Sequence, residues 1–405
     1  MKIAILTTAR SDFGPLKPVI RHASERFEVD LLVAGCHFLA SHGETIKEIE
    51  HELAQQNVDI VLFDAVENVS SVTSQVSTVA NTQLLASQWF SKNRCDLLLF
   101  LGDRWELWGV TLAAFLHGIP MAHISGGEVT EGVIDDCVRH SHTKLASLHF
   151  AATNEYARNI SLMGEEDWRI SVVEECGLDL IHFADVATPE QVKEKFEIDL
   201  MQPTLLVTFH PSTLDLETPA AEQIDALLLG LRSFSNHQVV FTAPGIEQGS
   251  DVVLAAIRDF VAIHPNAILI EHFGSHYYLS VMKSAKAVIG NSSSGLIEAP
   301  SFGVPAINIG LRQKNRLAAD SVQHVGYDAA AIETAITRAL TISHQDHARS
   351  CQNPYDPFRD GKNSLRIVQA IEHALKAIPV EQLRVKKFDN QIHADQWNQL
   401  YRKAI

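Results

Sequence analysis

Five short polar segments of this chain contain side chains that can transfer protons or bind an anion. They are Thr7–Gly14, Gly102–Arg104, Ser125–Glu128, His210–Pro211 and Asn291–Gly295, and each directly follows an apolar run. In doubly wound α/β sheets, ligands bind at the carboxyl ends of strands, so polar residues there are candidates for a site. One such segment is weak evidence, because strand ends are often polar for turn formation. Five together indicate an enzyme cleft between two domains.

The segment 291–295, with the sequence N-S-S-S-G, has the composition of an anion-binding loop. It precedes residues of helical character, so backbone N–H groups and serine hydroxyls can point at phosphate oxygens. A dense basic cluster, Arg312 to Arg316, offers positive charge near a strand end in a chain of net charge −16. An ordinary helix cap beside a solvated Glu298, or a solvated basic loop, would explain the same residues. The pattern favours a diphosphate site in the second half of the chain.

Asp103 and Glu128 lie just after predicted strands, and a third acidic residue, Asp135, follows seven residues after Glu128. Clustered carboxylates shift each other's pKa values, which allows one to act as an acid and another as a base near neutral pH. Arg139 and His210 can supply a cation and a proton-sharing group. Other roles stay open: a turn residue for Asp103, an exposed Glu128, a helix cap for Asp135 that pairs with Arg139, and a buried turn for His210.

Apolar runs that alternate with longer helical segments must position these residues. The runs are 2–6, 29–34, 58–63, 97–101, 120–124, 148–151, 204–209, 238–242, 267–270, 287–290 and 306–309. They are apolar on both faces, as strands between two helix layers must be, and segments such as 72–92 and 105–117 are long enough for crossover helices. This alternation of apolar runs and helical segments is interrupted in the charged stretch 185–203. We therefore expect two α/β domains with parallel sheets, 1–185 and 186–361.

The composition excludes several classes of protein. A hydrophobic fraction of 46% is typical of a folded chain, and the excess of 49 acidic over 33 basic residues disfavours nucleic acid and anionic membranes as partners. No apolar run has the length of a membrane span or signal peptide, and the five cysteines contain no C-x-x-C pair. The 20 histidines show no metal-binding spacing, and the first loop is not G-x-G-x-x-G. We expect a cytoplasmic protein without a metal site or a nicotinamide cofactor.

The polar segments also carry a family resemblance. The motifs are A-R-S-D-F-G (9–14), G-D-R (102–104), G-G-E (126–128), I-D-D-C-V-R-H (134–140), H-P (210–211), G-N-S-S-S-G-L-I-E (290–298) and I-N-I-G-L-R-Q-K-N-R (307–316). In order and approximate spacing, over residues 1 to 375, the chain resembles the UDP-N-acetylglucosamine 2-epimerase family, most closely its hydrolysing branch. The resemblance implies the GT-B arrangement: two Rossmann-like domains with parallel sheets facing a central cleft. It also implies that 362–375 packs back on the first domain.

The resemblance assigns roles to individual residues. On the nucleotide it places Ser292, Ser293, Gly295, Glu298, Arg312 and Arg316, with Arg10 and Ser11 closing on the phosphates from the first domain. Asp103, Glu128 and Asp135 match the family's three carboxylates, and Arg139 and His210 match its cationic or proton-sharing groups. It implies no cofactor, a UDP-sugar as the partner molecule, and a homodimer or homotetramer.

The implied reaction begins when UDP leaves C1 and a carboxylate removes the C2 proton, which gives a 2-acetamidoglucal. Water then adds, and N-acetylmannosamine is released for sialic-acid-type synthesis. Four alternatives stay open: a hydrolysing UDP-N,N'-diacetylbacillosamine epimerase for legionaminic acid, a non-hydrolysing epimerase, a GT-B glycosyltransferase, and a catalytically dead nucleotide-sugar sensor. The three carboxylates argue against the last two.

Three features depart from the family pattern. Ser125 stands where relatives usually carry His or Glu, and Glu247 stands in a glycine-rich loop where Asp is more usual. The tail 376–405 extends past the resemblance, and its sequence suggests only a packing or oligomer segment. These departures put the sugar contacts near Ser125 and the role of Glu247 in doubt.

Overall fold

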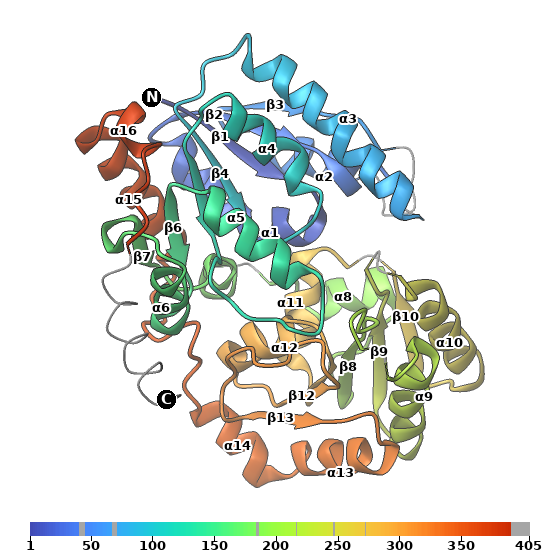
Figure 1. Cartoon of the computed structure of the whole chain (residues 1–405). Coiled ribbons are helices and arrows are strands. Elements are labelled where there is room, and N and C mark those ends of the chain that lie inside the picture. The colour runs from blue at the N-terminus through green and yellow to red at the C-terminus, as the bar shows by residue number, and fades with distance from the viewer. Residues whose placement is uncertain are drawn as a thin grey trace, which may run out of the picture. The chain divides into compact units, whose positions relative to one another are not determined.

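The computed structural model describes residues 1–39, 45–66, 71–183, 186–215, 217–245, 248–271 and 273–389. Within it the chain forms two compact units (Figure 1). The first contains residues 1–128, 137–177 and the C-terminal segment from Lys362, and the second contains 129–136 and 178–361. Because each unit has its own sheet and core, we describe each by itself.

The first unit contains a parallel sheet of seven strands within the described residues. The strands are β1 (Lys2–Thr7), β2 (Glu28–Val33), β3 (Val58–Leu62), β4 (Leu97–Leu101), β5 (Met121–Ile124), β6 (Leu148–Ala151) and β7 (Ile170–Val172). Their order is β3-β2-β1-β4-β5-β6-β7. The direction of winding reverses between β1 and β4, and such a switch point opens a crevice for ligands at the carboxyl ends of the strands.

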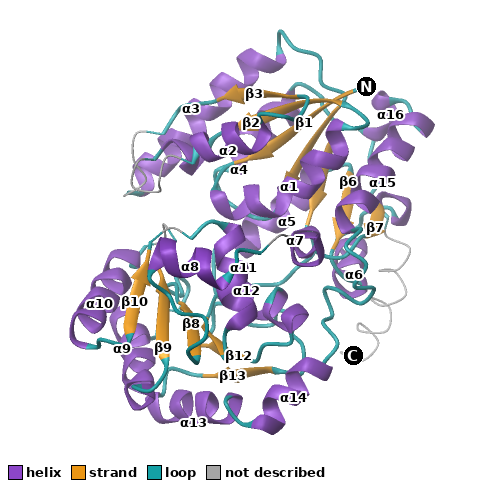
Figure 2. Cartoon of the chain, turned by 180° about the vertical axis from the view of Figure 1, so that it is seen from behind, coloured by secondary structure: helices purple, strands orange, loops and turns teal. Residues whose placement is uncertain are grey.

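Helices cover both faces of this sheet (Figure 2). They are α1 (Arg10–Ser24), α2 (Ile46–Leu53), α3 (Val72–Phe90), α4 (Leu107–Leu116), α5 (Asp135–Leu145), α6 (Asn154–Leu162), α15 (Asn363–Ala377) and α16 (Val380–Leu383). Along β1, Ile3 and Ile5 face the core under α1 and α15, whereas Ala4 and Leu6 face the core under α3 and α4. Side chains alternate between faces along a strand, so a strand covered twice must be apolar throughout.

The second unit repeats this design with a six-stranded parallel sheet among the described residues. The strands are β8 (Thr204–Thr208), β9 (Gln238–Thr242), β10 (Ala267–Ile270), β11 (Ala287–Gly290), β12 (Ala306–Ile309) and β13 (Val322–Val325), in the order β10-β9-β8-β11-β12-β13. The helices are α7 (Asp179–Phe183), α8 (Pro189–Phe196), α9 (Ala220–Leu231), α10 (Ser250–Ile263), α11 (Ser275–Ser284), α12 (Ser294–Ile297), α13 (Ala329–Ala339) and α14 (Ile342–Ser350). Winding reverses between β8 and β11, where the loop at 291 begins.

The prediction of two α/β domains with parallel sheets is confirmed, and each predicted run is a strand. Two strands were missed, β7 and β13. Both lie at a sheet edge and are only partly buried, so their residues I-S-V and V-Q-H-V lack the continuous apolar pattern of the interior strands. Within the described residues, no helix combines the length and apolar character needed to cross a membrane.

Candidate active site

In the first unit, a buried guanidinium joins the loops that follow β4 and β5. Arg139, on α5, is 1% exposed. It forms an ion pair with the Asp103 carboxylate and donates a hydrogen bond from Nη1 to the Glu128 carbonyl oxygen at 3.0 Å. Three residues predicted from the sequence are therefore brought together. Arg139 is therefore not a solvated helix-surface residue, because its side chain points inward.

Glu128 is also buried, at 1% exposure, so the alternative of a merely exposed side chain is wrong. The two preceding glycines allow this path. Gly127 has a φ of +77°, and a Cβ there would lie 2.3 Å from the Tyr156 carbonyl oxygen, so any larger residue would clash with the backbone. Asn159 donates a hydrogen bond to the Gly127 carbonyl at 2.8 Å, which anchors the loop on α6.

A buried histidine, not predicted from the sequence, supports the Asp103 loop. His123 on β5 is fully buried, and its Nε2 lies 2.7 Å from the Gly102 carbonyl oxygen. Burial lowers the pKa of His123 well below its usual value, so the ring is neutral and donates from Nε2. It stacks on Phe100, with ring centroids 4.8 Å apart. A histidine within an otherwise apolar strand was the signal that could have found it.

Ser125, the departure before the two glycines, contacts a second unpredicted residue. Its hydroxyl donates to Oε2 of Glu175 at 2.9 Å, and both side chains are 7% exposed. Asn363 donates to the Glu175 carbonyl oxygen at 3.0 Å. A carboxylate from the segment after β7 therefore lies beside the loop that carries Glu128. Nothing at sequence level marked Glu175, since the two acidic residues 174 and 175 look like a solvated pair.

The first loop is organised around Asp12 rather than around Arg10. The buried Asp12 carboxylate accepts hydrogen bonds from the Thr8 amide at 2.9 Å, from the Thr8 hydroxyl at 2.7 Å and from the amide of the N-cap residue Ala9 at 3.2 Å. It therefore holds the loop at the start of α1. Arg10 pairs with Glu48 at 3.2 Å, and Ser11 is exposed. Both predicted residues thus lie at the start of α1, with Arg10 oriented by an acidic neighbour.

In the second unit, one asparagine ties together the loops after β8 and β11. Asn291 accepts a hydrogen bond from the His210 amide and donates one to the His210 carbonyl, both at 2.7 Å. The Gly245 amide donates to Nδ1 of His210 at 3.0 Å, so a neutral His210 carries its proton on Nε2. A Cβ added at Gly290 would lie only 1.9 Å from the Thr208 carbonyl oxygen. Only glycine permits this close approach of β11 to β8.

The basic cluster reaches the same loop. Arg312 donates to the Asn291 carbonyl oxygen at 3.3 Å, and Gln313 donates to it at 3.0 Å. Arg316 donates to the Gln313 side chain at 3.1 Å, whereas Lys314 forms an ion pair with Glu131 at 3.2 Å. Arg312 therefore contacts the N-S-S-S-G segment directly, Arg316 is connected to it through Gln313, and Lys314 is directed elsewhere.

The remaining predicted residues border this loop or begin α5. Ser292 and Ser293 precede α12, Gly295 lies within it, and Glu298 follows it, half-buried. Asp135 is the first residue of α5 and lies in the second unit. Glu247 lies outside the described residues. Among the described residues there is no group of three His, Cys, Asp or Glu side chains that could hold a metal ion.

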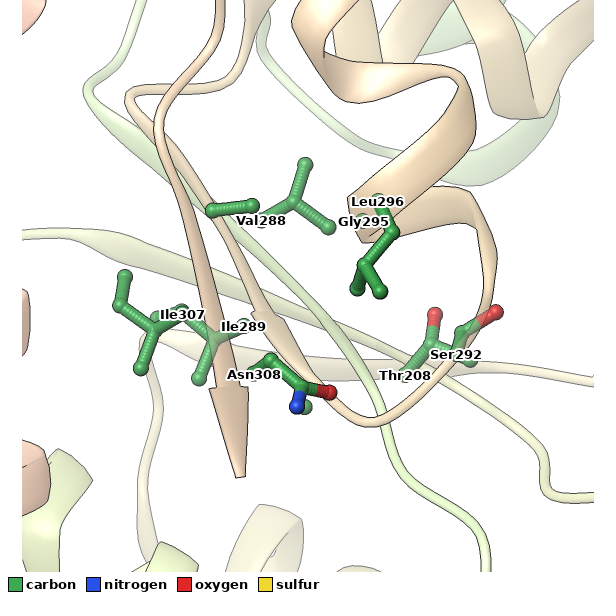
Figure 3. Close-up of a pocket in the computed structure, with 10 residues that line it drawn as sticks. Thr208, Val288, Ile289, Ser292, Gly295, Leu296, Ile307 and Asn308 are labelled. Carbon is green, nitrogen blue, oxygen red and sulfur yellow. The ribbon is translucent and has the colours of Figure 1, made fainter. Parts of the chain in front are cut away.

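A small pocket adjoins the loop, between β11, β12 and α12 (Figure 3). Its lining is mainly apolar, from Val288, Ile289, Leu296 and Ile307, with the hydroxyl groups of Thr208 and Ser292 near one another at one side. Because the pocket is small and mainly apolar, we interpret it as a packing gap behind the loop.

Comparisons with known proteins agree on one family. A family model described as UDP-N-acetylglucosamine 2-epimerase matches residues 21–372. The chain is 32% identical to the polysialic acid biosynthesis protein P7 of Escherichia coli over 376 residues, 91% of this chain and 93% of that one. It is also 31% identical to the GDP/UDP-N,N'-diacetylbacillosamine 2-epimerase (hydrolyzing) of Campylobacter jejuni over 327 residues. This match covers 79% of this chain and 83% of the relative.

A crystal structure of UDP-GlcNAc 2-epimerase from Neisseria meningitidis bound to UDP-GlcNAc superposes with a TM-score of 0.78. The match covers 92% of this chain and all of that one at 18% sequence identity, so it shows a shared fold.

Proposed function

We propose that this chain, which belongs to the UDP-N-acetylglucosamine 2-epimerase family, is a hydrolysing UDP-N-acetylglucosamine 2-epimerase. It would convert UDP-N-acetylglucosamine and water into UDP and N-acetylmannosamine for sialic-acid-type synthesis. The observation that carries the proposal is the buried Arg139, which joins the Asp103 carboxylate to the Glu128 loop. A glycosyl transfer needs no such set of carboxylates, whereas removal and return of a C2 proton needs a positioned base and a positioned acid.

The reaction is proposed to start with an elimination. The C1–O bond to UDP breaks, and a carboxylate of the set Asp103, Glu128 and Asp135 takes the C2 proton, which gives a 2-acetamidoglucal. Water then adds its oxygen to C1, and C2 receives a proton on the face opposite to the one from which the first proton was removed. Arg139 holds the Asp103 carboxylate in one orientation, and such fixed geometry is how a protein speeds proton transfer. His210, with its proton on Nε2, is assigned to proton sharing.

The second unit is proposed to hold the UDP group. Asn291 fixes the N-S-S-S-G loop, and Arg312 and Arg316 bring positive charge to it. Charge-assisted hydrogen bonds from guanidinium groups suit a diphosphate, and they act locally despite the chain's net charge of −16. The complete set assigned to the nucleotide is Arg10, Ser11, Ser292, Ser293, Gly295, Glu298, Arg312 and Arg316, with Glu298 on the ribose.

Two related reactions are kept as alternatives. The name of the Campylobacter jejuni relative supports a hydrolysing UDP-N,N'-diacetylbacillosamine epimerase. A non-hydrolysing epimerase would use the same carboxylates but would add UDP, instead of water, back to C1, so that no UDP is released. We also propose a cytoplasmic location, because all five cysteines are free thiols, as expected in a reducing compartment.

Isotope incorporation tests the proposal. The protein is incubated with UDP-N-acetylglucosamine in heavy water, and UDP and the sugar product are analysed by NMR and mass spectrometry. We expect free N-acetylmannosamine with one deuterium at C2, formed together with UDP. Release of UDP with an unlabelled C2 would contradict the epimerase proposal, and deuterated UDP-sugar without UDP release would indicate the non-hydrolysing reaction.

A parallel incubation with UDP-N,N'-diacetylbacillosamine decides the substrate. A kcat/KM that is at least tenfold higher for this sugar would assign the chain to the legionaminic acid alternative. The Asp103→Asn protein serves as the control in both incubations, because it should release neither product at a comparable rate.

A further inference from the structure

A polar pocket lies on the second unit, where α13 ends and α14 begins (Figure 1). Its volume is about 300 Å³, and it is lined by Arg338, Thr341, Ser343, His344 and His347. Each of these side chains can donate a hydrogen bond, and none of the five is an acidic or an apolar residue. None of them belongs to the set assigned to UDP. A lining of this composition suits an anion.

The beginning of α14 adds backbone donors to this lining. The first N–H groups of a helix have no carbonyl partner within it and lie at the positive end of the helix dipole. Thr341, the residue before α14, accepts a hydrogen bond from the His344 amide at 3.3 Å. This cap does not serve the amides of Ile342 and Ser343, which precede His344. Phosphate groups bind at helix ends of this kind.

The positive charge beside these amides is not neutralised by a neighbouring acid. The Arg338 guanidinium is exposed, and it forms no ion pair with a residue that the structure describes. Asp346, the acidic residue of α14, pairs with Arg349 at 2.8 Å instead. The pocket therefore presents positive charge on a chain whose net charge is −16.

A buried side chain in the lining lacks a partner. His344 is 6% exposed, and its Nε2 atom has no hydrogen-bond partner in the described part of the chain. Such atoms are rare in folded proteins, because the group loses its bond to water and gains none in return. Since His344 lines the pocket, a bound molecule can supply the missing partner. A phosphate suits either tautomer of the ring, because its oxygens accept and its protonated form also donates.

We propose that the pocket between α13 and α14 binds the phosphate group of a small molecule. The amides of Ile342 and Ser343 donate to the phosphate oxygens at the helix end, and Arg338 adds a charge-assisted hydrogen bond. Nε2 of His344 pairs with the same group. A volume of about 300 Å³ is the lower limit of pockets that hold small organic ligands, so it leaves room for the organic part of a phosphate monoester. This site goes beyond the proposed reaction.

Calorimetric titration of the full chain with inorganic phosphate tests the site. Saturating UDP is present throughout, to keep phosphate away from the N-S-S-S-G loop. We expect the native chain to bind phosphate with a dissociation constant below about 1 mM. Arg338→Gln should raise this constant at least tenfold, because it removes the charge-assisted hydrogen bond. The matched control is Arg349→Gln on α14, an exposed arginine that pairs with Asp346, and it should stay within about twofold of the native value.

A second variant separates loss of the site from misfolding. Ser343→Asp places a carboxylate in the first turn of α14, where it favours the helix but repels phosphate. Phosphate affinity should therefore fall at least tenfold, while the midpoint of urea denaturation stays the same or rises. Native affinity in this variant, or equal effects of Arg338→Gln and Arg349→Gln, would overturn the proposal. These comparisons need no turnover, so they hold whether or not the chain hydrolyses UDP-N-acetylglucosamine.

A parallel titration with glucose 6-phosphate distinguishes the two sources of the phosphate group. A dissociation constant at least tenfold lower than that of inorganic phosphate, and raised by Arg338→Gln, would assign the pocket to phosphate monoesters. Equal constants for the two probes would assign it to the free ion. Absence of binding by both probes to the native chain would overturn the proposal.

Discussion

At the scale of single residues, the site of the first unit depends on one buried cation. Arg139 makes the contacts that hold the Asp103 side chain and the Glu128 backbone in place. Glu128 is as deeply buried as Arg139. Buried charged groups are costly unless they are paired, and so their presence in a cluster is more typical of function than of stability.

Removal of either carboxylate should slow turnover strongly without loss of UDP binding. Asp103→Asn and Glu128→Gln keep side-chain volume but lose the basic oxygen, so we expect kcat to fall by about a hundredfold or more. UDP affinity should stay within about twofold by calorimetric titration. The control is Glu155→Gln, an exposed acid in the first turn of α6. Native turnover in both carboxylate variants would show that the assignment is wrong.

His123 should act as a positioning residue for Asp103. Its ring donates to the Gly102 carbonyl at 2.7 Å, so His123→Phe leaves that oxygen without this donor and should lower kcat by about tenfold. His123→Gln places an amide N–H near the position of Nε2 and should restore part of the rate. KM should change little in either variant. If the Phe variant keeps the native kcat, His123 has only a packing role.

Arg312 should bind the nucleotide. Arg312→Ala removes a charge-assisted hydrogen bond, which typically contributes about 1.5 to 3 kcal/mol. We therefore expect a dissociation constant for UDP that is higher by about tenfold or more. Lys314→Ala is the matched control, since Lys314 pairs with Glu131 rather than with the loop. Equal effects of the two substitutions would indicate general electrostatic attraction instead of a specific contact.

At the scale of elements, the C-terminal segment after α15 is bound firmly to the first unit. Arg169 donates hydrogen bonds to the carbonyl oxygens of Leu383 and Val385 at 2.9 and 2.8 Å. Lys386 donates to the Ala146 carbonyl at 2.7 Å and pairs with the buried Glu165 at 2.7 Å. The sequence suggested no more than a packing or oligomer segment here. The described part of the tail therefore packs against the first unit. Trp397, also in the tail, lies outside the described residues.

Loss of the Lys386 side chain should destabilise the first unit. Lys386→Ala leaves the Glu165 carboxylate and the Ala146 carbonyl with one donor fewer, and a buried polar group that loses its partner costs about 1–3 kcal/mol. Urea denaturation followed by circular dichroism measures the change. The adjacent Lys387→Ala, an exposed side chain, should have almost no effect. Equal stability of the two variants would contradict the role assigned to Lys386.

At the scale of the whole molecule, several buried histidines link stability to pH. Burial lowers the pKa of His37 to about 3 and the pKa of His142 to about 4, while an unfolded chain has histidine pKa values near 6.5. Below about pH 6.5 the unfolded chain therefore binds more protons than the folded one. Stability must then rise with pH through this window and fall as the pH decreases toward 4.

This linkage predicts a measurable loss of stability in mild acid. Between pH 7 and pH 5.5, each of these two histidines should lower the free energy of unfolding by roughly 1 kcal/mol. Urea denaturation at the two pH values measures the change, and His142→Gln should make it smaller by roughly 1 kcal/mol. Burial raises the pKa of Glu165, but hydrogen bonds from His149, Lys144 and Lys386 outweigh this effect and lower that pKa to about 2. Glu165 therefore adds a further loss of stability only below about pH 4.5. Stability that is unchanged or higher at pH 5.5 would contradict the prediction.

Local pattern determined much of this protein from its sequence alone. Continuous apolar runs predicted the interior strands, because a strand covered on both faces has no polar side, and polar residues after those runs predicted where chemistry could occur. The edge strands β7 and β13 were missed because partial burial leaves no such pattern.

Only the tertiary structure decided which of these residues meet. The pairs Arg139–Asp103, Asn291–His210 and Arg169–Leu383 are separated by 36, 81 and 214 residues. His123, Glu175 and Lys386 went unrecognised for the same reason, since the partner that gives each its role is distant in the chain. Sequence periodicity reports the burial of a residue within its own element. The partner of a buried charge is set by strand order, which brings the ends of distant strands to one edge of the sheet.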